Sequence, residues 1–168
     1  MRDAVDEITD QWRRERPDLT DTLWPMGLVG RVQRLNRVLE RELKDFFAGY
    51  DLELWEMDVL LTLRRAGAPY ALTPGALLKA AMVSSGAMTN RIDRLETKGL
   101  VTRQADAADR RSVKVRLTDQ AVSMVDGLMD KHLANEARLF STLDPAERDQ
   151  LAGLMRKVLA ERGDTSIH

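Results

Sequence analysis

Apolar residues recur at helical spacing along most of the chain. They predict a short amphipathic helix over residues 3–16, a long helix over about 25–48 and an apolar helix over 53–66. A helix that is apolar on nearly every side, as 53–66 is, normally lies buried in a core. Pro17 ends the first helix because the residue before a proline avoids the helical region, and a polar loop over 18–24 is expected next.

Residues 73–98 contain several residues that are typical of helix ends. Thr73 is a typical helix N-cap and Pro74 a typical first helical residue, so a short helix should run to about residue 80. Ser84 and Ser85 can cap a second helix that ends near Lys98. Two short helices joined by a tight turn form a helix-turn-helix.

Alternation of apolar and polar residues with period two follows over 100–104 and 112–117. This spacing predicts two strands of a hairpin whose charged tip carries Asp109, Arg110 and Arg111. A charged hairpin directly after a helix-turn-helix is a wing, and an arginine at its tip can enter a minor groove or hold a phosphate. Asp109 can brace one of the arginines by a charge-assisted pair.

Two more long helices are predicted after the hairpin, and with helix 25–48 they carry more apolar surface than the remaining chain can cover. This surplus predicts a homodimer. The predicted fold class is mainly α: a winged helix-turn-helix with long N- and C-terminal dimerisation helices and a two-stranded β wing. The expected parts are an N-terminal extension (1–24), dimerisation helices (25–52 and 118–161), a DNA-binding lobe (53–117) and a flexible tail (162–168).

Composition removes several classes of function. The 168 residues include no cysteine, which excludes disulfides, thiolate catalysis and iron–sulfur clusters. Two histidines do not favour a histidine-rich metal site, so no cofactor is expected. No apolar run approaches the ~20 residues that span a bilayer. The acidic N-terminus lacks an apolar signal core, and we expect a cytoplasmic protein.

The net charge of −1 conceals an uneven distribution. Residues 73–117 hold nine basic and four acidic side chains, a net charge of +5, whereas residues 1–72 and 118–168 each carry −3. A basic centre on a chain of otherwise acidic charge is the pattern of a nucleic-acid-binding face.

The second helix of the helix-turn-helix has an apolar stripe and an outer polar stripe. Hydroxyl, amide and guanidinium groups on such a stripe match base edges and phosphates in a major groove, although a solvated helix face looks similar. Together with the wing, this pattern predicts DNA contacts from Ser84, Ser85, Thr89, Asn90, Arg94, Arg110 and Arg111.

Residues 84–118 (SSGAMTNRIDRLETKGLVTRQADAADRRSVKVRLT) strongly resemble the MarR-type winged helix-turn-helix regulators. The resemblance extends over residues 25–161. It implies a homodimer in which the first and last long helices interlock and each subunit presents one winged helix to half of a pseudo-palindromic operator on double-stranded DNA. It further implies a ligand-responsive transcriptional regulator, a repressor, and no enzymatic activity.

A finer resemblance rests on the tryptophan-bearing N-terminal helix and on the segments WEMDVL and GAMTNRIDRLE, which look like the urate-responsive branch of the family. That branch implies a ligand site made of Trp12, Asp58, Arg91 and Arg103. These four supply an aromatic wall, an acceptor for ring N–H groups and two cationic donors. A planar, N–H-rich monoanion such as urate satisfies all of them.

Three alternatives compete with this reading. The same regulator could respond to another anionic aromatic, such as a phenolic or aryl carboxylate compound. A small acid–base enzyme using Asp58 and Arg91 is disfavoured because no nucleophile or second acid–base group accompanies them. A helical dimerisation module without DNA function is disfavoured by the basic centre and the arginine-tipped hairpin.

Overall fold

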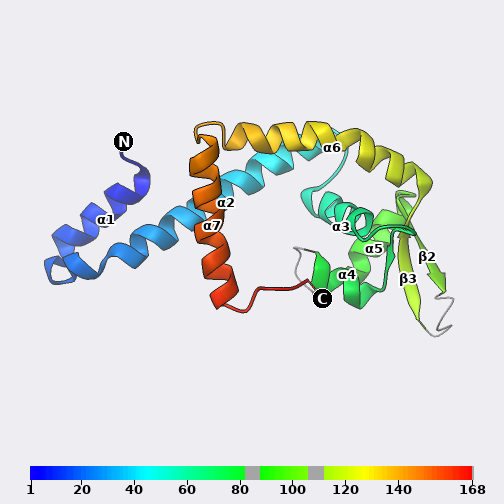
Figure 1. Cartoon of the computed structure of the whole chain (residues 1–168), viewed down its shortest axis with the longest axis horizontal. Helices are drawn as coiled ribbons and strands as arrows, with labels where there is room; N and C mark the ends of the chain where they lie inside the picture. Colours follow the sequence, from blue (N-terminus) through cyan, green and yellow to red (C-terminus); the bar gives the residue numbers. More distant parts are fainter. Residues whose placement is uncertain (82–87, 106–111, 168) are drawn as a thin grey trace. The chain divides into compact units, whose positions relative to one another are not determined.

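A computed structural model describes residues 1–81, 88–105 and 112–167 (Figure 1). The chain divides into two compact units, residues 1–45 and 46–168, and each is described by itself. The helix and strand pattern predicted from the sequence recurs in both units.

The first unit is a helical hairpin. α1 (Ala4–Glu15) confirms the predicted amphipathic helix, and α2 (Trp24–Ala48) begins in this unit. Between them, the predicted polar loop is instead a short 3-10 helix, η1 (Pro17–Thr22). Proline at its first position has the fixed φ that a helical turn requires, so the same Pro17 that ends α1 also begins η1.

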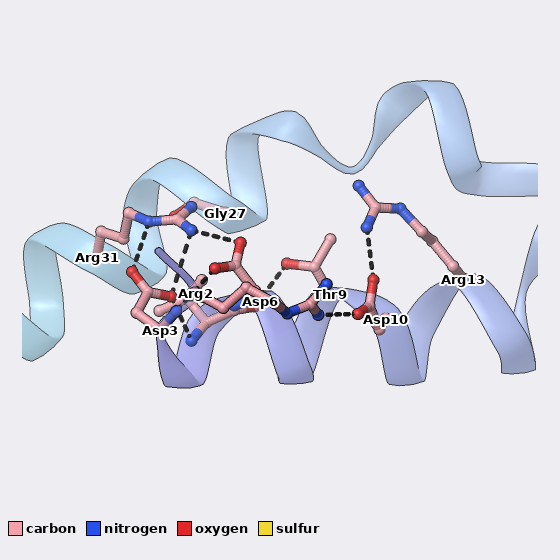
Figure 2. Close-up of polar contacts among 9 residues, drawn as sticks. Arg2, Asp3, Asp6, Thr9, Asp10, Arg13, Gly27 and Arg31 are labelled. Atoms are coloured by element: carbon pink, nitrogen blue, oxygen red, sulfur yellow. Dashed lines mark hydrogen bonds and ion pairs between the residues drawn. The ribbon is translucent and has the colours of Figure 1, made fainter.

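α1 packs against α2 at a glycine. Val5 of α1 is only 2% exposed. A Cβ atom placed on Gly30 of α2 would lie 3.2 Å from the Cγ1 atom of Val5. Arg31, the next residue of α2, donates hydrogen bonds to Asp3 at 2.9 Å and to Asp6 at 2.7 Å (Figure 2). The missing side chain lets the helices approach, and the arginine ties the first turn of α1 to α2.

The second unit holds the predicted lobe. Its elements are α3 (Leu54–Arg65), β1 (Ala71–Leu72), α4 (Pro74–Ala80), α5 (Met88–Thr97), β2 (Val101–Ala105), β3 (Val113–Leu117), α6 (Asp119–Leu139) and α7 (Pro145–Glu161). α3, α4, α5 and the β2–β3 hairpin gather near one end of α6 (Figure 1).

β2 and β3 form the predicted two-stranded wing, and β1 adds a third strand to it in an antiparallel sheet of order β1-β3-β2. Ala71 pairs with Arg116 and Leu72 with Val115. A strand of two residues is too short to produce an alternating pattern, so the sequence carried no signal for β1.

Threonine N-caps begin α4 and α6, and a glycine ends α5. Thr73 accepts a hydrogen bond from the backbone N–H of Ala76 at 3.2 Å, and Thr118 accepts one from Ala121 at 3.1 Å. Gly99 closes α5 with a φ of +70°, a conformation that other residues rarely adopt.

The core of the lobe receives buried side chains from α3, α4, α5, β2, β3 and α6. α3 is buried on most of its surface, as its apolar sequence predicts. Side chains with almost no exposure come from every side: Met57, Val59, Leu60 and Leu63 of α3, Leu77 of α4, Ile92 and Leu95 of α5, Val101 and Val115 of the sheet, and Val125 of α6.

Candidate nucleic-acid interface and ligand site

α5 presents the predicted recognition surface. Met88, Ile92 and Leu95 face the core, whereas Thr89 and Asn90 are exposed. Arg94 is exposed on the same outer side of the helix. The structure therefore places these three predicted DNA contacts where a major groove could reach them. The other four, Ser84, Ser85, Arg110 and Arg111, lie outside the described residues.

One flank of α5 rests on an aromatic side chain at the start of α3. The guanidinium carbon of Arg91 lies 5.3 Å from the centre of the Trp55 ring, and that of Arg94 lies 5.1 Å from it. Both distances suit cation–π contacts. The Nη1 atom of Arg91 is buried and has no hydrogen-bond partner within residues 1–81, 88–105 and 112–167. A buried donor without an acceptor is costly, and an anion placed there would satisfy it.

A partly buried ion pair joins the end of α5 to the same turn of α3. Lys98 donates to Oε2 of Glu56 at 2.8 Å and to the carbonyl of Asp51 at 3.0 Å. Glu56 is fully buried, and its Oε2 also accepts the backbone N–H of Glu53 at 2.9 Å. Removing one partner of such a pair leaves an uncompensated charge, so Lys98 and Glu56 hold α5 on α3.

The opposite flank of α5 carries carboxylates that bind Arg103 of β2. Arg103 forms ion pairs with Asp93 and Glu96 of α5, and the hydrogen bond that it donates to Asp93 is the main reason that its pKa is raised. Successive residues of an α-helix are separated by about 100°, so Asp93 points roughly opposite to Arg91. Arg103 is therefore engaged on the side of α5 away from the Trp55 ring.

Three of the four predicted ligand residues lie in the second unit and one lies in the first. Arg91 and Asp58 lie in the lobe, and Asp58 is half-buried on α3. Arg103 is held by α5 carboxylates on the other flank. Trp12 belongs to the first unit, where it is 42% exposed and the buried α1 residues are Val5 and Thr9. The four-residue ligand site remains a prediction.

The candidate residues predicted from the sequence did not include the carboxylates that pair with Lys98 and Arg103, namely Glu56, Asp93 and Glu96. A carboxylate inside an apolar helix is costly unless it is paired, and Asp58 is half-buried, whereas the fully buried carboxylate of α3 is that of Glu56. Its position three residues after the cap residue Glu53 is a capping-box spacing that could have identified it. For Asp93 and Glu96 the sequence carried no comparable signal.

Other site types find no support in the described part of the chain. No group of three histidine or acidic residues there could hold a metal ion. None of its helices has the length and apolar character needed to cross a membrane. A cavity of about 790 Å³ opens between α3 and α4, lined in part by Thr62, Arg65, Leu72 and Lys79, and it contains none of the predicted ligand residues.

The geometry defines a class of protein: a winged helix-turn-helix that exposes a polar recognition helix beside a β hairpin. Comparison with known proteins agrees. A family model described as the MarR family matches residues 50–112. The transcriptional regulator PecS of Dickeya dadantii is 38% identical over 154 residues, which cover 92% of this chain and 92% of PecS. The chain therefore belongs to the MarR family of DNA-binding transcriptional regulators, and its role is regulatory rather than enzymatic.

Two solved structures resemble this chain along most of their length. A mutant MarR from E. coli complexed with operator DNA superposes with a TM-score of 0.69 at 26% identity, covering 88% of this chain and 97% of that one. Bordetella bronchiseptica BpsR, described for the regulation of its DNA binding by 6-hydroxynicotinic acid, has a TM-score of 0.69 at 26% identity, covering 77% and 90%.

Proposed function

We propose that this protein is a homodimeric repressor that binds a pseudo-palindromic operator and is released from it by a small anionic aromatic ligand, with urate the first candidate. The observation that carries the DNA-binding part is the outer face of α5, where Thr89, Asn90 and Arg94 are exposed above a closed core. A regulator of this kind works on chromosomal DNA and therefore in the cytoplasm.

Operator binding can be tested without knowing the operator. Selection from random-sequence duplexes should enrich a palindrome with half-sites about one helical turn apart, because two-fold symmetric proteins read two-fold symmetric DNA. Arg111→Ala should weaken binding to it by ~1–3 kcal/mol in fluorescence anisotropy while the protein stays folded. Unchanged affinity at physiological salt would remove Arg111 from the interface, and failure to enrich any palindrome would contradict the proposal as a whole.

The dimer is supported by apolar side chains that α2 and α7 leave exposed. Leu28 and Val32 of α2 are mostly exposed, as are Leu154 and Val158 of α7. Single exposed apolar residues are ordinary, but stripes of them along long helices mark an interaction surface. Sedimentation at micromolar concentration should give about twice 19.0 kDa. A stable monomer would contradict the homodimer and the palindromic operator together.

The ligand proposal rests on Arg91. Its buried Nη1 has no hydrogen-bond partner among the residues that the structure describes, and Arg91 projects from the recognition helix itself. An anion that draws this guanidinium inward would turn α5, and the two recognition helices of a dimer must stay ~34 Å apart to fit successive grooves. A hundredfold release needs ~2.8 kcal/mol of differential binding, within the usual range of one allosteric coupling.

A second ligand class is favoured by a specific comparison. BpsR is regulated by 6-hydroxynicotinic acid, which is also a planar heteroaromatic anion. An aryl carboxylate could occupy the same cationic site, with its carboxylate on Arg91. The two candidates differ in the hydrogen bonds that they can donate to Asp58. Urate has several ring N–H groups that could donate to this carboxylate, whereas an aryl carboxylate has few or none.

The deciding experiment titrates the protein–operator complex with urate, 6-hydroxynicotinate and benzoate separately. Urate should release the parent protein, and release should be much weaker in Arg91→Ala and in Trp12→Phe. Trp24→Phe is the matched control, since Trp24 is an exposed tryptophan outside the predicted site. No release by millimolar urate would contradict the urate proposal, and release by 6-hydroxynicotinate alone would establish the alternative.

A further inference from the structure

The recognition helix carries a row of three cations on the flank that faces α3. Arg91, Arg94 and Lys98 are spaced three and four residues apart, so they lie on one side of α5. The first turn of α3 meets them with Glu53 and Glu56, and with the Trp55 ring between the two arginines. Arg94 and Lys98 thus each have a carboxylate partner at the start of α3, and the two arginines share the Trp55 ring.

Arg94 is held by two residues that also hold each other. Its Nη2 donates to Oε1 of Glu53 at 2.5 Å, and its guanidinium lies over the Trp55 ring. The indole N–H of Trp55 donates to Oε2 of the same carboxylate at 2.6 Å. We call this pair, Glu53 and Trp55, the Arg94 dock. It draws the guanidinium towards α3, although Arg94 stands on the outer face of the recognition helix.

The dock is open to solvent. The side chains of Arg94 and Glu53 are 56% and 51% exposed. Ion pairs at this exposure contribute little net stability, so another anion can replace the carboxylate at small cost. A DNA phosphate offers the same charge and oxygen geometry to an arginine. The hydrogen bond from Arg94 lowers the pKa of Glu53, so its carboxylate is ionised at neutral pH.

The neighbouring pair behaves differently. Lys98 and Glu56 are also joined by an ion pair, but the Glu56 carboxylate is fully buried and cannot be exchanged for a phosphate. Glu56 therefore fixes the helix, and Glu53 is the exchangeable acceptor. One turn of α3 thus supplies a structural carboxylate and a competing carboxylate to the same helix.

We propose that Glu53 limits how tightly this protein binds DNA: it holds Arg94 on Trp55 in the free protein, and a DNA phosphate must displace it. The inference rests on the proposed contact between Arg94 and DNA. Because every phosphate competes with Glu53, whatever the sequence, the carboxylate weakens binding to unrelated DNA as well as to the operator. The operator has base contacts to offset that loss, and unrelated DNA has none.

The test compares Glu53→Gln with Asp51→Asn. Glutamine keeps an acceptor for the Trp55 N–H and removes the charge that holds Arg94. Asp51→Asn removes one negative charge from the same loop without touching Arg94, and asparagine tolerates the φ of +57° there. Both proteins are measured by anisotropy on the selected operator and on an unrelated duplex, over about 50 to 200 mM salt.

Glu53→Gln should bind the operator about three- to tenfold more tightly, as expected when two weak exposed ion pairs per dimer are removed. It should bind the unrelated duplex more tightly by at least the same factor. The logarithmic slope of its affinity against salt should stay close to that of the parent, because Arg94 contacts the same phosphate in both complexes. Asp51→Asn should change affinity less than twofold, and both variants should melt within a few degrees of the parent.

Measurements on Arg94→Ala and on the double variant with Glu53→Gln separate a failure of the Glu53 proposal from a failure of the proposed Arg94 contact with DNA. Arg94→Ala alone should weaken binding, and Glu53→Gln should give no gain in that background. If Glu53→Gln binds no better than the parent, or binds more weakly, Glu53 braces Arg94 in the bound state and the proposal is overturned. If Arg94→Ala binds as the parent does, Arg94 does not contact DNA, and the proposal fails while operator binding stands.

Discussion

The DNA-binding lobe and the long helices place their apolar side chains in opposite environments. In α3, Val59, Leu60 and Leu63 are fully buried. In α7, Leu154 and Val158 are each 59% exposed. One chain therefore completes the core of the lobe and leaves the apolar stripes of the long helices open. The difference fits the proposed homodimer, in which a second subunit would cover the exposed stripe of α7.

The largest expected effect lies in the closed core. Leu60→Ala should lower the free energy of unfolding by about 2–5 kcal/mol, because the lobe surrounds this side chain and cannot fill the cavity left behind. Chemical denaturation at fixed protein concentration measures it. Leu133→Ala is the matched control, because Leu133 is half exposed on α6. Equal losses at the two positions would remove the distinction between closed and open regions.

The next effect concerns the open stripe of α7. Val158→Glu should raise the dissociation constant of the dimer about a hundredfold, or ~2.7 kcal/mol. A two-fold interface contains each substitution twice and would bury both charges. Sedimentation over a range of concentrations reports the shift. Lys157→Glu makes the neighbouring residue acidic without removing apolar surface, and a similar loss there would show that charge alone weakens the dimer.

A smaller effect is expected in the α1–α2 hairpin, whose contact is narrow. Gly30→Leu should destabilise the docking of α1 by about 1–3 kcal/mol, since even its Cβ atom would lie 3.2 Å from Val5. Faster proteolysis within α1 would report the loss. Gly127→Leu is the control, because a Cβ atom there meets nothing within 4 Å. Equal proteolysis of the parent and Gly30→Leu would mean that α1 does not depend on this contact.

The smallest effect is electrostatic and lies at the edge of the lobe. Arg64 donates to Asp126 at 2.8 Å, and this hydrogen bond lowers the pKa of Asp126. A lowered pKa means that the pair stabilises the fold above the unfolded pKa of about 3.9 and ceases to do so as pH falls through the folded value. Asp126→Asn should therefore be slightly less stable than the parent at neutral pH, and the difference should vanish in acid. If Asp126→Asn remains less stable than the parent in acid, the loss of stability comes from packing and not from the ion pair.

The elements were predictable because helix and strand signals are local. Spacing of apolar residues and capping residues such as Thr73, Thr118 and Gly99 act within a few positions, and the structure confirms the helices and the hairpin that they predict. β1 and η1 were not predicted, because a two-residue strand takes its identity from pairing with β3 and a short polar turn has no period.

The candidate site was predictable only in part. Thr89, Asn90 and Arg94 are exposed as expected, since the apolar stripe of α5 decides by itself which side turns outward. On α3 the same reasoning fails, because a helix that is apolar all round has no distinguished face. It could not separate Glu56, which is buried, from Asp58, which is half-buried. Nor could it assign Arg103 to Asp93 and Glu96.

The sequence by itself determined the order of elements, the outward face of the recognition helix and membership of the MarR family. Tertiary structure alone decided how charges pair: that Glu56 receives Lys98, that Glu53 and Trp55 hold Arg94, and that Arg103 turns to the far flank of α5. The physical reason is range. Helix formation depends on neighbours three or four positions away, whereas Glu53 and Arg94 are 41 residues apart in sequence and meet only after α3 and α5 have packed.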